Sequence, residues 1–355
     1  MKVAVVALTR RGAGVAARVA GGLSRADLYL HRRWAADWPA AIPFQPPLKE
    51  LVGNLFPRYE GLVLVMATGI VVRVIAGFLR DKASDPAVVV VDEGGSFAIS
   101  LLSGHLGGAN HLAREVAACL GAQAVITTAS DARGYPALDL LARELGCAVE
   151  PGGSMKAVMA HLVNGGRVRL LAEPACVAGG LGGKLKGIAV ETLDPQSPVD
   201  WQPGEAMVLL TSRVLPVPPG TTHVYLRPRH LVVGVGCRRG VGEKEVLNAI
   251  CRAMDRARRS LASLRALATV EFKGAEEGLI KAAEALGVPL KLVSRGDIAL
   301  LEGKYRPSEL VRRAVGVGGV CEPAAILATG QGDLLLGKTV FGRVTVAIAS
   351  ARYGW

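Results

Sequence analysis

Acid and base side chains gather between residues 92 and 105 of the sequence. Asp92 and Glu93 directly follow the apolar run VVVV and precede two glycines. In doubly wound sheets the carboxyl ends of the strands line the ligand crevice, so this acidic pair is well placed to exchange protons with a bound molecule. A hairpin turn with two solvated carboxylates is the alternative that the same residues leave open.

The tripeptide SGH, at positions 103–105, adds a histidine ahead of a glycine-rich helix start. An imidazole exchanges protons near neutral pH, and the Ser103 hydroxyl could donate to a developing oxyanion or cap the helix. The residues around Ser103 do not match the G-x-S-x-G elbow of the α/β-hydrolases. We predict that His105 is a functional residue and that His111, inside the helix that follows, is structural.

Thr68 and Gly69 stand where a strand should end and a helix begin. Free amides and the helix dipole at such a point attract carboxylates and other anions, so the sequence predicts an anion site, unless Thr68 simply caps the helix. Glu322 leaves a similar choice open. It could face a crevice, or it could stabilise the start of the helix that Pro323 opens.

Two glycine motifs look like nucleotide-binding loops. Residues 332–339 satisfy G-x-x-x-x-G-K-T, but the intervening DLLL and the following VFGRVTVAIA are predicted strands, whereas a phosphate loop follows a strand and opens a helix. The segment GVGCRRGVG, at 234–242, has a strand-turn-helix context but carries Arg239 where the dinucleotide motif needs its third glycine. We therefore predict no nucleotide site, although the amides of the second loop, with Arg238 and Arg239, could still bind an anion.

Apolar β-rich runs alternate with longer amphipathic stretches, which is typical of βα units around a mostly parallel sheet, so the fold class is α/β. The predicted strands cover residues 3–9, 62–66, 88–92, 124–127, 231–237, 268–272 and 290–293, with a closing hairpin at 333–336 and 343–349. The predicted helices cover residues 14–23, 69–79, 107–120, 243–261 and 275–286. Gly121 is expected to stop the third helix.

Prolines divide the chain into parts. Between residues 135 and 229 the pattern becomes shorter and more broken, and it includes the stiff run LPVPPG. We predict a multi-domain protein with an N-terminal α/β domain (1–132), a smaller α/β linking domain (133–229) and a C-terminal α/β domain (230–355).

Composition limits the compartment and the partner. The 355 residues show no signal peptide and no apolar run of membrane-spanning length, and the six cysteines form no CxxC pair, so we expect a cytoplasmic protein with reduced thiols. The formal net charge of +12 attracts an anionic partner. Because the cations are spread along the chain and aromatic residues are few, we expect an acidic metabolite, with no nucleic acid and no membrane.

Several of these segments resemble one family. MATGIVVR, LRDKASDPAVVVVDEGG, LLSGHLGGANHLARE and ITTASD are similar to the amino-terminal region of the cobalt-precorrin-5A hydrolases of anaerobic cobalamin (vitamin B12) biosynthesis. GVGCRRG, TVEFKGAEEGL, CEPAAIL and TVAIA resemble the carboxy-terminal region, which also occurs as a separate protein in the aerobic pathway. The resemblance covers residues 60–132 and 230–350, and elsewhere it is one of placement and general character.

The resemblance implies a hydrolase that opens the δ-lactone of a polycarboxylated cobalt tetrapyrrole and releases acetaldehyde as the ring contracts. We expect His105, assisted by Glu93 or Asp92, to move protons, and Thr68 and Ser103 to stabilise oxyanions. Cobalt enters within the substrate, so no cofactor is expected, although His105 as an axial cobalt ligand is an open alternative. The expected substrate-binding residues are Thr68, Gly69, Arg73, Lys82, Gly104, Asn110, Gly236, Arg238, Arg239, Lys273 and Glu322.

Neighbouring pathway enzymes are further expected partners. A non-catalytic corrinoid-binding or handover protein is the rival interpretation, because it would keep the basic and glycine-rich features without needing an acid/base cluster.

Overall fold

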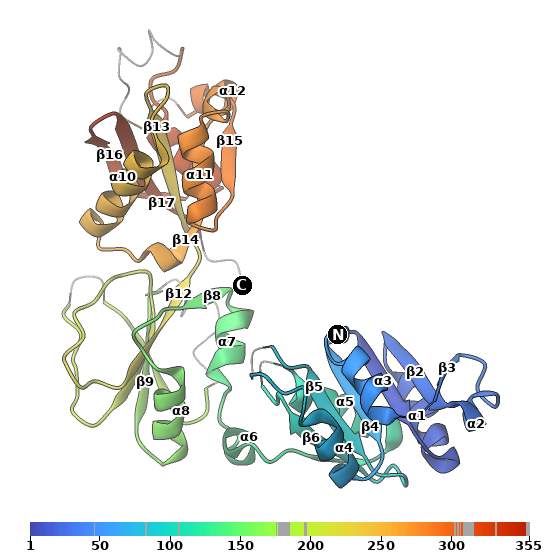
Figure 1. Ribbon diagram of the computed structural model, residues 1–355. Coiled ribbons are helices and arrows are strands. Elements are labelled where there is room, and N and C mark those ends of the chain that lie inside the picture. Colours follow the sequence, from blue (N-terminus) through green and yellow to red (C-terminus); the bar gives the residue numbers. More distant parts are fainter. Residues whose placement is uncertain are drawn as a thin grey trace. The chain divides into compact units, whose positions relative to one another are not determined.

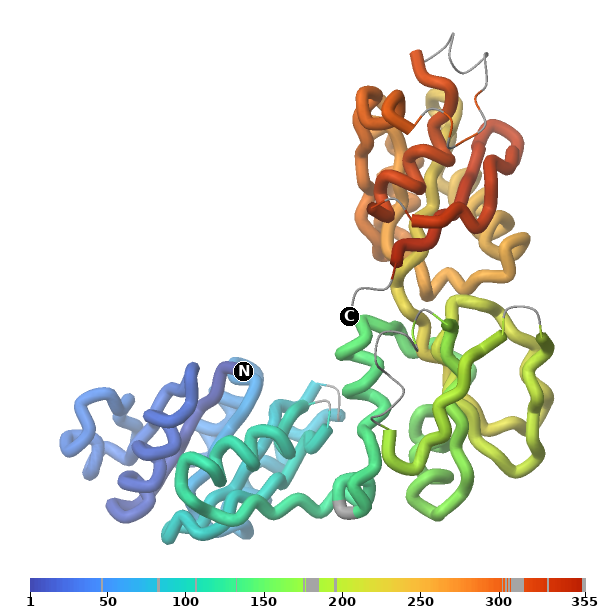
Figure 2. Tube along the Cα trace, turned by 180° about the vertical axis from the view of Figure 1, so that it is seen from behind, coloured from blue at the N-terminus to red at the C-terminus, as the bar shows by residue number. Residues whose placement is uncertain are grey.

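The computed structural model describes residues 1–45, 47–81, 84–105, 107–174, 176, 185–194, 197–301, 303, 305, 307, 316–330 and 332–352. The chain divides into two compact units, Met1–Leu140 and Leu141–Trp355, each built of sheets with packed helices (Figures 1 and 2). A search of the described helices for one long and apolar enough to cross a membrane found none.

One seven-stranded sheet forms the N-terminal unit, in the order β3-β2-β1-β4-β5-β6-β7. Strands β1 to β5 are parallel, β6 is antiparallel to β5, and β7 is parallel to β6. The carboxyl ends of β6 and β7 therefore lie at the opposite edge of the sheet from those of the first five strands. The strands are β1 (Val3–Ala7), β2 (Ala26–His31), β3 (Ala41–Phe44), β4 (Gly61–Val65), β5 (Ala87–Val91), β6 (Phe97–Leu102) and β7 (Gln123–Val125).

Helices cover both faces of this sheet, which explains why its central strands are apolar without alternation. The buried residues of β1 and β4 divide between two cores, one shared with α1 and α5 and the other with α3 and α4. The helices are α1 (Arg10–Gly22), α2 (Arg32–Ala35), α3 (Leu48–Leu55), α4 (Thr68–Ile75), α5 (Ala109–Leu120) and α6 (Ala129–Arg133), and α7 (Leu138–Glu144) contains the boundary between the units.

The strand order reverses between β1 and β4. From β1 the chain proceeds outward through β2 to β3, and it then returns to place β4 on the other side of β1. Because α1 and α4 leave this point on opposite faces, the loops after β1 and β4 separate and open a crevice. Ligands of doubly wound sheets bind at such a switch point.

Two five-stranded sheets form the second unit, in the orders β10-β9-β11-β12-β8 and β15-β14-β13-β17-β16. The first contains β8 (Cys147–Val149), β9 (Val168–Ala172), β10 (Ile188–Thr192), β11 (Ala206–Leu210) and β12 (His223–Pro228), with α8 (Met155–Val163). The second contains β13 (Leu231–Cys237), β14 (Leu264–Val270), β15 (Leu290–Val293), β16 (Asp333–Phe341) and β17 (Val344–Ser350), with α10 (Glu243–Arg256), α11 (Glu277–Ala285), α12 (Arg295–Ala299) and α14 (Cys321–Ala328).

The structure confirms the α/β fold class and the predicted strands and helices to within a few residues at most ends. Gly121 ends α5 in the left-handed region, with φ of +67°, as its predicted role as a helix stop requires. Gly337 and Thr339 lie inside β16, so the G-x-x-x-x-G-K-T match is a strand. In the N-terminal unit the sequence analysis missed β2, β3 and β6. The three-domain division stays a prediction.

Candidate active site

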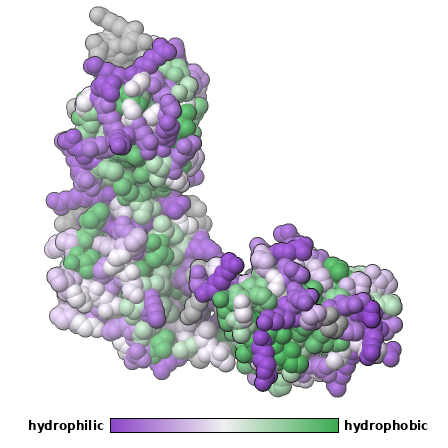
Figure 3. Space-filling model, viewed as in Figure 1, coloured by the Kyte–Doolittle hydropathy of each residue, from purple (hydrophilic) through white to green (hydrophobic). Residues whose placement is uncertain are grey.

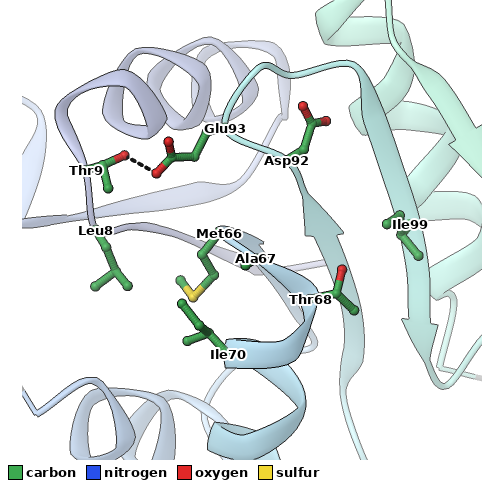
Figure 4. Close-up of a pocket in the computed structure, with 9 residues that line it drawn as sticks. All are labelled: Leu8, Thr9, Met66, Ala67, Thr68, Ile70, Asp92, Glu93 and Ile99. Carbon is green, nitrogen blue, oxygen red and sulfur yellow. Dashed lines mark hydrogen bonds between the residues drawn. The ribbon is translucent and has the colours of Figure 1, made fainter.

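A pocket of about 360 Å³ opens at the switch point of the N-terminal sheet (Figure 4). Its walls come from the loops that follow β1, β4 and β5, together with one side chain of β6. Most of its lining is apolar, and its polar groups are the hydroxyls of Thr9 and Thr68 and the carboxylates of Asp92 and Glu93. Sequence positions far apart in the chain thus meet where the fold places a ligand crevice.

The two carboxylates of the pocket differ in their bonding. Asp92 accepts three backbone hydrogen bonds, from the N–H groups of Gly94 (3.0 Å), Ser96 (2.8 Å) and Phe97 (2.7 Å). These bonds shape the turn between β5 and β6, so Asp92 builds the hairpin that the sequence left as its alternative role. Glu93 is exposed and accepts one bond, from the Thr9 hydroxyl at 2.7 Å.

Helix α4 begins at this pocket. Its N-cap is Ala67, whose carbonyl accepts the first helical bonds, from the N–H groups of Ile70 and Val71. The amides of Thr68 and Gly69 precede these donors and point out of the helix start, as an anion site requires. Thr68 is therefore not the cap. Arg73 is exposed and donates to the Gly69 carbonyl at 3.2 Å, and Lys82 lies outside the described residues.

Exposed apolar side chains lie on α4 and β6, two of the elements that contribute to the pocket. Ile70 and Val72 on α4 are 41% and 48% exposed, and Phe97 at the start of β6 is 44% exposed. Figure 3 shows apolar residues gathered on this face of the N-terminal unit. A ligand at this edge would meet more hydrocarbon than charge.

A second group of polar residues surrounds His105 at the opposite edge of the sheet. Nε2 of His105 lies 3.1 Å from the Ser130 hydroxyl and 3.6 Å from Oδ2 of Asp131. Both residues follow β7, which runs parallel to β6 and therefore ends beside it. Ser130, His105 and Asp131 have the residue types of a Ser-His-Asp triad. Their geometry differs from a triad, because the Ser130 hydroxyl and the Asp131 carboxylate approach the same ring nitrogen.

Asp131 is tightly held. Oδ2 accepts hydrogen bonds from the Thr128 hydroxyl at 2.6 Å and from the Asn110 amide at 3.0 Å, and Oδ1 accepts one from Arg114 at 2.9 Å. Burial on its own would raise the pKa of Asp131, but the bonds from Thr128 and Arg114 and the proximity of His105 outweigh it and lower the pKa. Asp131 is therefore a carboxylate at neutral pH.

The loop that presents His105 has a constrained backbone. Ser103 has a positive φ of 58°, which is rare for a residue with a side chain, and its hydroxyl donates to the Asp85 carbonyl at 3.0 Å. A Cβ on Gly104 would lie 2.8 Å from Oδ1 of Asn110, and one on Gly107 would lie 2.3 Å from Cβ of Ser103. Two glycines are thus required for close approach. In this arrangement Ser103 and Gly104 shape the loop.

The expected single cluster is therefore wrong. His105 follows β6 and Asp92 and Glu93 follow β5, and these strands are antiparallel. The groups lie at opposite ends of the sheet, separated by the length of a six-residue strand, about 20 Å. Neither carboxylate can assist His105 directly. Asp131, which the sequence analysis did not select, occupies that position instead.

Asn110 also differs from its expected role. It is buried, with 5% of its surface exposed, and it accepts a bond from the Ser100 hydroxyl at 2.6 Å while its amide donates to Thr128 and Asp131. The oxygen and the amide of the Asn110 side chain thus bond to other side chains of the protein, not to a substrate. His111, by contrast, is 75% exposed and lies 3.4 Å from Glu115 one turn along α5.

The carboxyl ends of β13 and β14 hold the charged residues expected in the C-terminal region. Lys273 binds Glu276 at 2.8 Å, and Glu276 also accepts the Gly240 amide at 3.0 Å. The Lys273 bond, followed by the Gly240 bond, lowers the pKa of Glu276. A carboxylate of the protein thus occupies the site expected to bind an anion, while Arg238 and Arg239 are exposed.

Gly236 and Glu322 have structural contacts. A Cβ on Gly236 would lie 2.7 Å from the Thr345 hydroxyl oxygen, so the glycine permits close strand pairing. Glu322 is buried and accepts the Lys338 amide at 2.9 Å, where β16 breaks its register with β17. Among the described residues, no three His, Cys, Asp or Glu side chains gather as a metal site would need.

The fold and these sites define a class, an α/β protein whose N-terminal unit has a pocket at its switch point and a histidine held beside a carboxylate. The chain matches the family models Cobalamin synthesis G N-terminal (50–131), Cobalamin biosynthesis central region (136–228) and Cobalamin synthesis G C-terminus (231–349).

Two relatives that span most of the chain agree with these models. The cobalt-precorrin-5A hydrolase of Priestia megaterium is 34% identical over 99% of this chain and 95% of its own. The hydrolase of the same name from Salmonella typhimurium is 37% identical over 84% of each. The crystal structure of CobE, a protein from the cobalamin biosynthetic pathway, matches 36% of this chain and 94% of its own at 30% identity, with a TM-score of 0.34. The chain belongs to the cobalamin synthesis G family, which confirms the resemblance seen in its motifs.

Proposed function

We propose that this protein is a cobalt-precorrin-5A hydrolase of anaerobic cobalamin biosynthesis. Water opens the δ-lactone of the macrocycle, and the carbon-carbon bond to the former meso carbon then breaks to release acetaldehyde and give cobalt-precorrin-5B. The names of the relatives that span the chain support the substrate. The oriented imidazole of His105 is the observation that supports acid/base chemistry in this chain.

Lactone opening needs a base that removes a proton from water as it attacks the carbonyl carbon. We infer that Nε2 of His105 carries its hydrogen toward Ser130 and Asp131, which leaves the lone pair on Nδ1, for which the described residues supply no hydrogen bond. Nδ1 therefore takes the proton. The imidazolium then protonates the departing ring oxygen, so one residue serves both halves of the hydrolysis.

Carbon-carbon cleavage reuses the same base. The hydroxyl that lactone opening frees loses its proton to His105, its oxygen forms the carbonyl of acetaldehyde, and the electron pair of the broken bond enters the conjugated macrocycle. No external oxidant or reductant is needed, because the electrons stay within the ring. This scheme needs no second acid/base residue. It is therefore compatible with the position of Asp92 and Glu93 at the opposite end of the sheet from His105.

Substrate binding uses groups that the protein leaves available. We propose that, in the N-terminal unit, the exposed Arg73 attracts a carboxylate of the substrate and the α4 amides of Thr68 and Gly69 can hold it. In the second unit, the exposed Arg238 and Arg239 add to the positive charge that attracts an anionic molecule. Cobalt arrives within the substrate. A cytoplasmic location suits the free cysteines, and transfer from and to neighbouring pathway enzymes suits a reactive intermediate.

The test is anaerobic incubation with cobalt-precorrin-5A, following acetaldehyde and the mass of the macrocycle together. His105→Gln is expected to lower kcat at least about 100-fold, the usual size of a general-base effect. His111→Gln is the matched control, because that histidine is exposed and paired only along its own helix. Its rate should equal that of the wild type.

The Glu93→Gln variant tests which end of the N-terminal sheet carries the chemistry, the end with His105 or the end with the switch-point pocket. We expect it to lower kcat less than tenfold, because the carboxylate is a strand length away from His105. A large loss in Glu93→Gln with little change in His105→Gln would move the chemistry to the switch-point pocket. Tight binding without acetaldehyde release by the wild-type protein would favour the handover protein instead.

A further inference from the structure

We propose that Asp131 is a positioning residue for His105, and that it selects the ring tautomer in which Nδ1 is the base. This inference rests on the proposed function and names a residue that acts through another. Its carboxylate lies 3.6 Å from Nε2. The side chains of His105 and Asp131 are only 27% and 19% exposed, so water screens the interaction weakly.

The negative charge of Asp131 decides which tautomer of the His105 ring is favoured. Ser130 lies within hydrogen-bonding distance of Nε2 and can either donate or accept. A hydrogen on Nε2 places the positive end of the N–H dipole toward the carboxylate, whereas a lone pair on Nε2 would face negative charge. Asp131 therefore favours Nε2–H, Ser130 accepts from it, and Nδ1 keeps its lone pair. The same charge stabilises the imidazolium that forms when Nδ1 takes a proton.

Three elements fix the carboxylate in place. Ser100 on β6 donates to Oδ1 of Asn110 on α5, which turns the Asn110 amide toward Asp131. Thr128, just after β7, donates to the same carboxylate oxygen, and Arg114 binds the other. Every oxygen of the carboxylate thus has a directed donor. Such an arrangement holds a charge at one position, as support for a catalytic imidazole requires.

Replacing Arg114 should change the electrostatic field at His105 in the opposite direction to replacing Asp131, which gives the inference a second test. The Arg114 side chain is 55% exposed, so replacing it should leave the fold intact. Its positive charge offsets part of the Asp131 charge that His105 senses. Removing Asp131 and removing Arg114 therefore change the electrostatic field at the imidazole in opposite directions.

The first experiment is the pH profile of kcat for acetaldehyde release. Asp131→Asn should lower kcat about 100-fold with KM changed less than threefold, and it should move the acid limb to lower pH because the imidazolium loses its nearby anion. Arg114→Gln should move the same limb to higher pH. Asp131→Glu should restore the position of the limb and part of the rate. Asp37→Asn, at an exposed ion pair with Arg10, is the control and should match the wild type.

A second experiment works without turnover. Nitrogen-15 NMR of the histidine side chains should show the Nε2–H tautomer at His105 in the wild type and a mixture of tautomers in Asp131→Asn. If the wild type releases no acetaldehyde, the function fails while this measurement still tests the tautomer. An unchanged acid limb in Asp131→Asn, limbs that move the same way in the two variants, or a wild-type Nδ1–H tautomer would each overturn the inference.

Discussion

Arg227→Met tests how the second unit holds its two sheets together. Arg227 is 1% exposed and lies at the end of β12. Its guanidinium binds Glu150, donates to the carbonyls of Thr211 (2.9 Å) and Arg213 (2.7 Å), and stacks on a tyrosine ring. Glu150 in turn accepts the hydroxyl of Ser260, from the segment that leads to β14, so the network spans both sheets.

The magnitude follows from the Glu150 carboxylate, which the substitution leaves without its ionic partner. Removing one partner of a buried ion pair costs about 3–5 kcal/mol, and the 25% exposure of Glu150 places this case near the lower limit. At about 2–4 °C per kcal/mol for a unit of this length, the Tm of the second unit should fall by about 6–12 °C. Methionine fills a similar volume, so a cavity contributes little.

Differential scanning calorimetry measures this loss. Lys281→Met is the control, because its side chain is 53% exposed and that of its partner Glu277 is 78% exposed, so its Tm should change by less than about 2 °C. The double variant Arg227→Met/Glu150→Met should regain at least half of the loss, since no charge is then left unpaired. A fall in Arg227→Met no larger than in the control, or no recovery in the double variant, would refute the reasoning.

Three further predictions concern stability. In Gly234→Ala the new Cβ would lie 1.9 Å from the Cys321 carbonyl oxygen, so urea unfolding should show a loss of about 2–3 kcal/mol. Gly121→Ala should cost about 1 kcal/mol because its φ is +67°, whereas Gly14→Ala, inside α1 with open space around it, should stabilise by about 0.5 kcal/mol; equal effects of the two would contradict the backbone argument. Burial lowers the pKa of His230, although Glu173 and the Pro228 carbonyl oppose this. The unfolded chain then takes the proton first, so stability is present above the ordinary pKa of 6.5 and is lost as the pH falls below it, and calorimetry from pH 7.5 to 5.5 should show a steeper loss in the wild type than in His230→Asn.

Local patterns predicted much of the fold. The apolar runs of β1, β4 and β5 and the glycine that ends α5 lie where the sequence placed them. Residues 103–105 and 128–131 also belong to segments whose family resemblance was visible from the sequence. These features depend on chain neighbours, because a strand between helices and a helix stop are set by side-chain pattern and backbone freedom within a few residues.

The direction of β6 had a local signal in the turn that precedes it. Its apolar run FAISLL follows DEGGS, a sequence that suits a tight turn, and a hairpin there would have reversed the strand and separated Glu93 from His105. Without that reversal, the sequence analysis placed Glu93 and His105, twelve residues apart, at the same end of the sheet. Asp131 was missed for a related reason, because its partner His105 is reached only through the pairing of β6 with β7.

The sequence by itself determined that this is an α/β protein of a recognisable family with His105 in a glycine-rich, chemically suited loop. Only the tertiary structure decided which carboxylate stands beside that histidine and which expected site residues instead serve the scaffold, such as Asp92 in its turn and Asn110 under Asp131. The physical reason is that ionic and hydrogen-bonded partners are chosen by distance in space. Strand order and direction set those distances, and the pairing of strands that are distant in sequence is encoded in no local pattern.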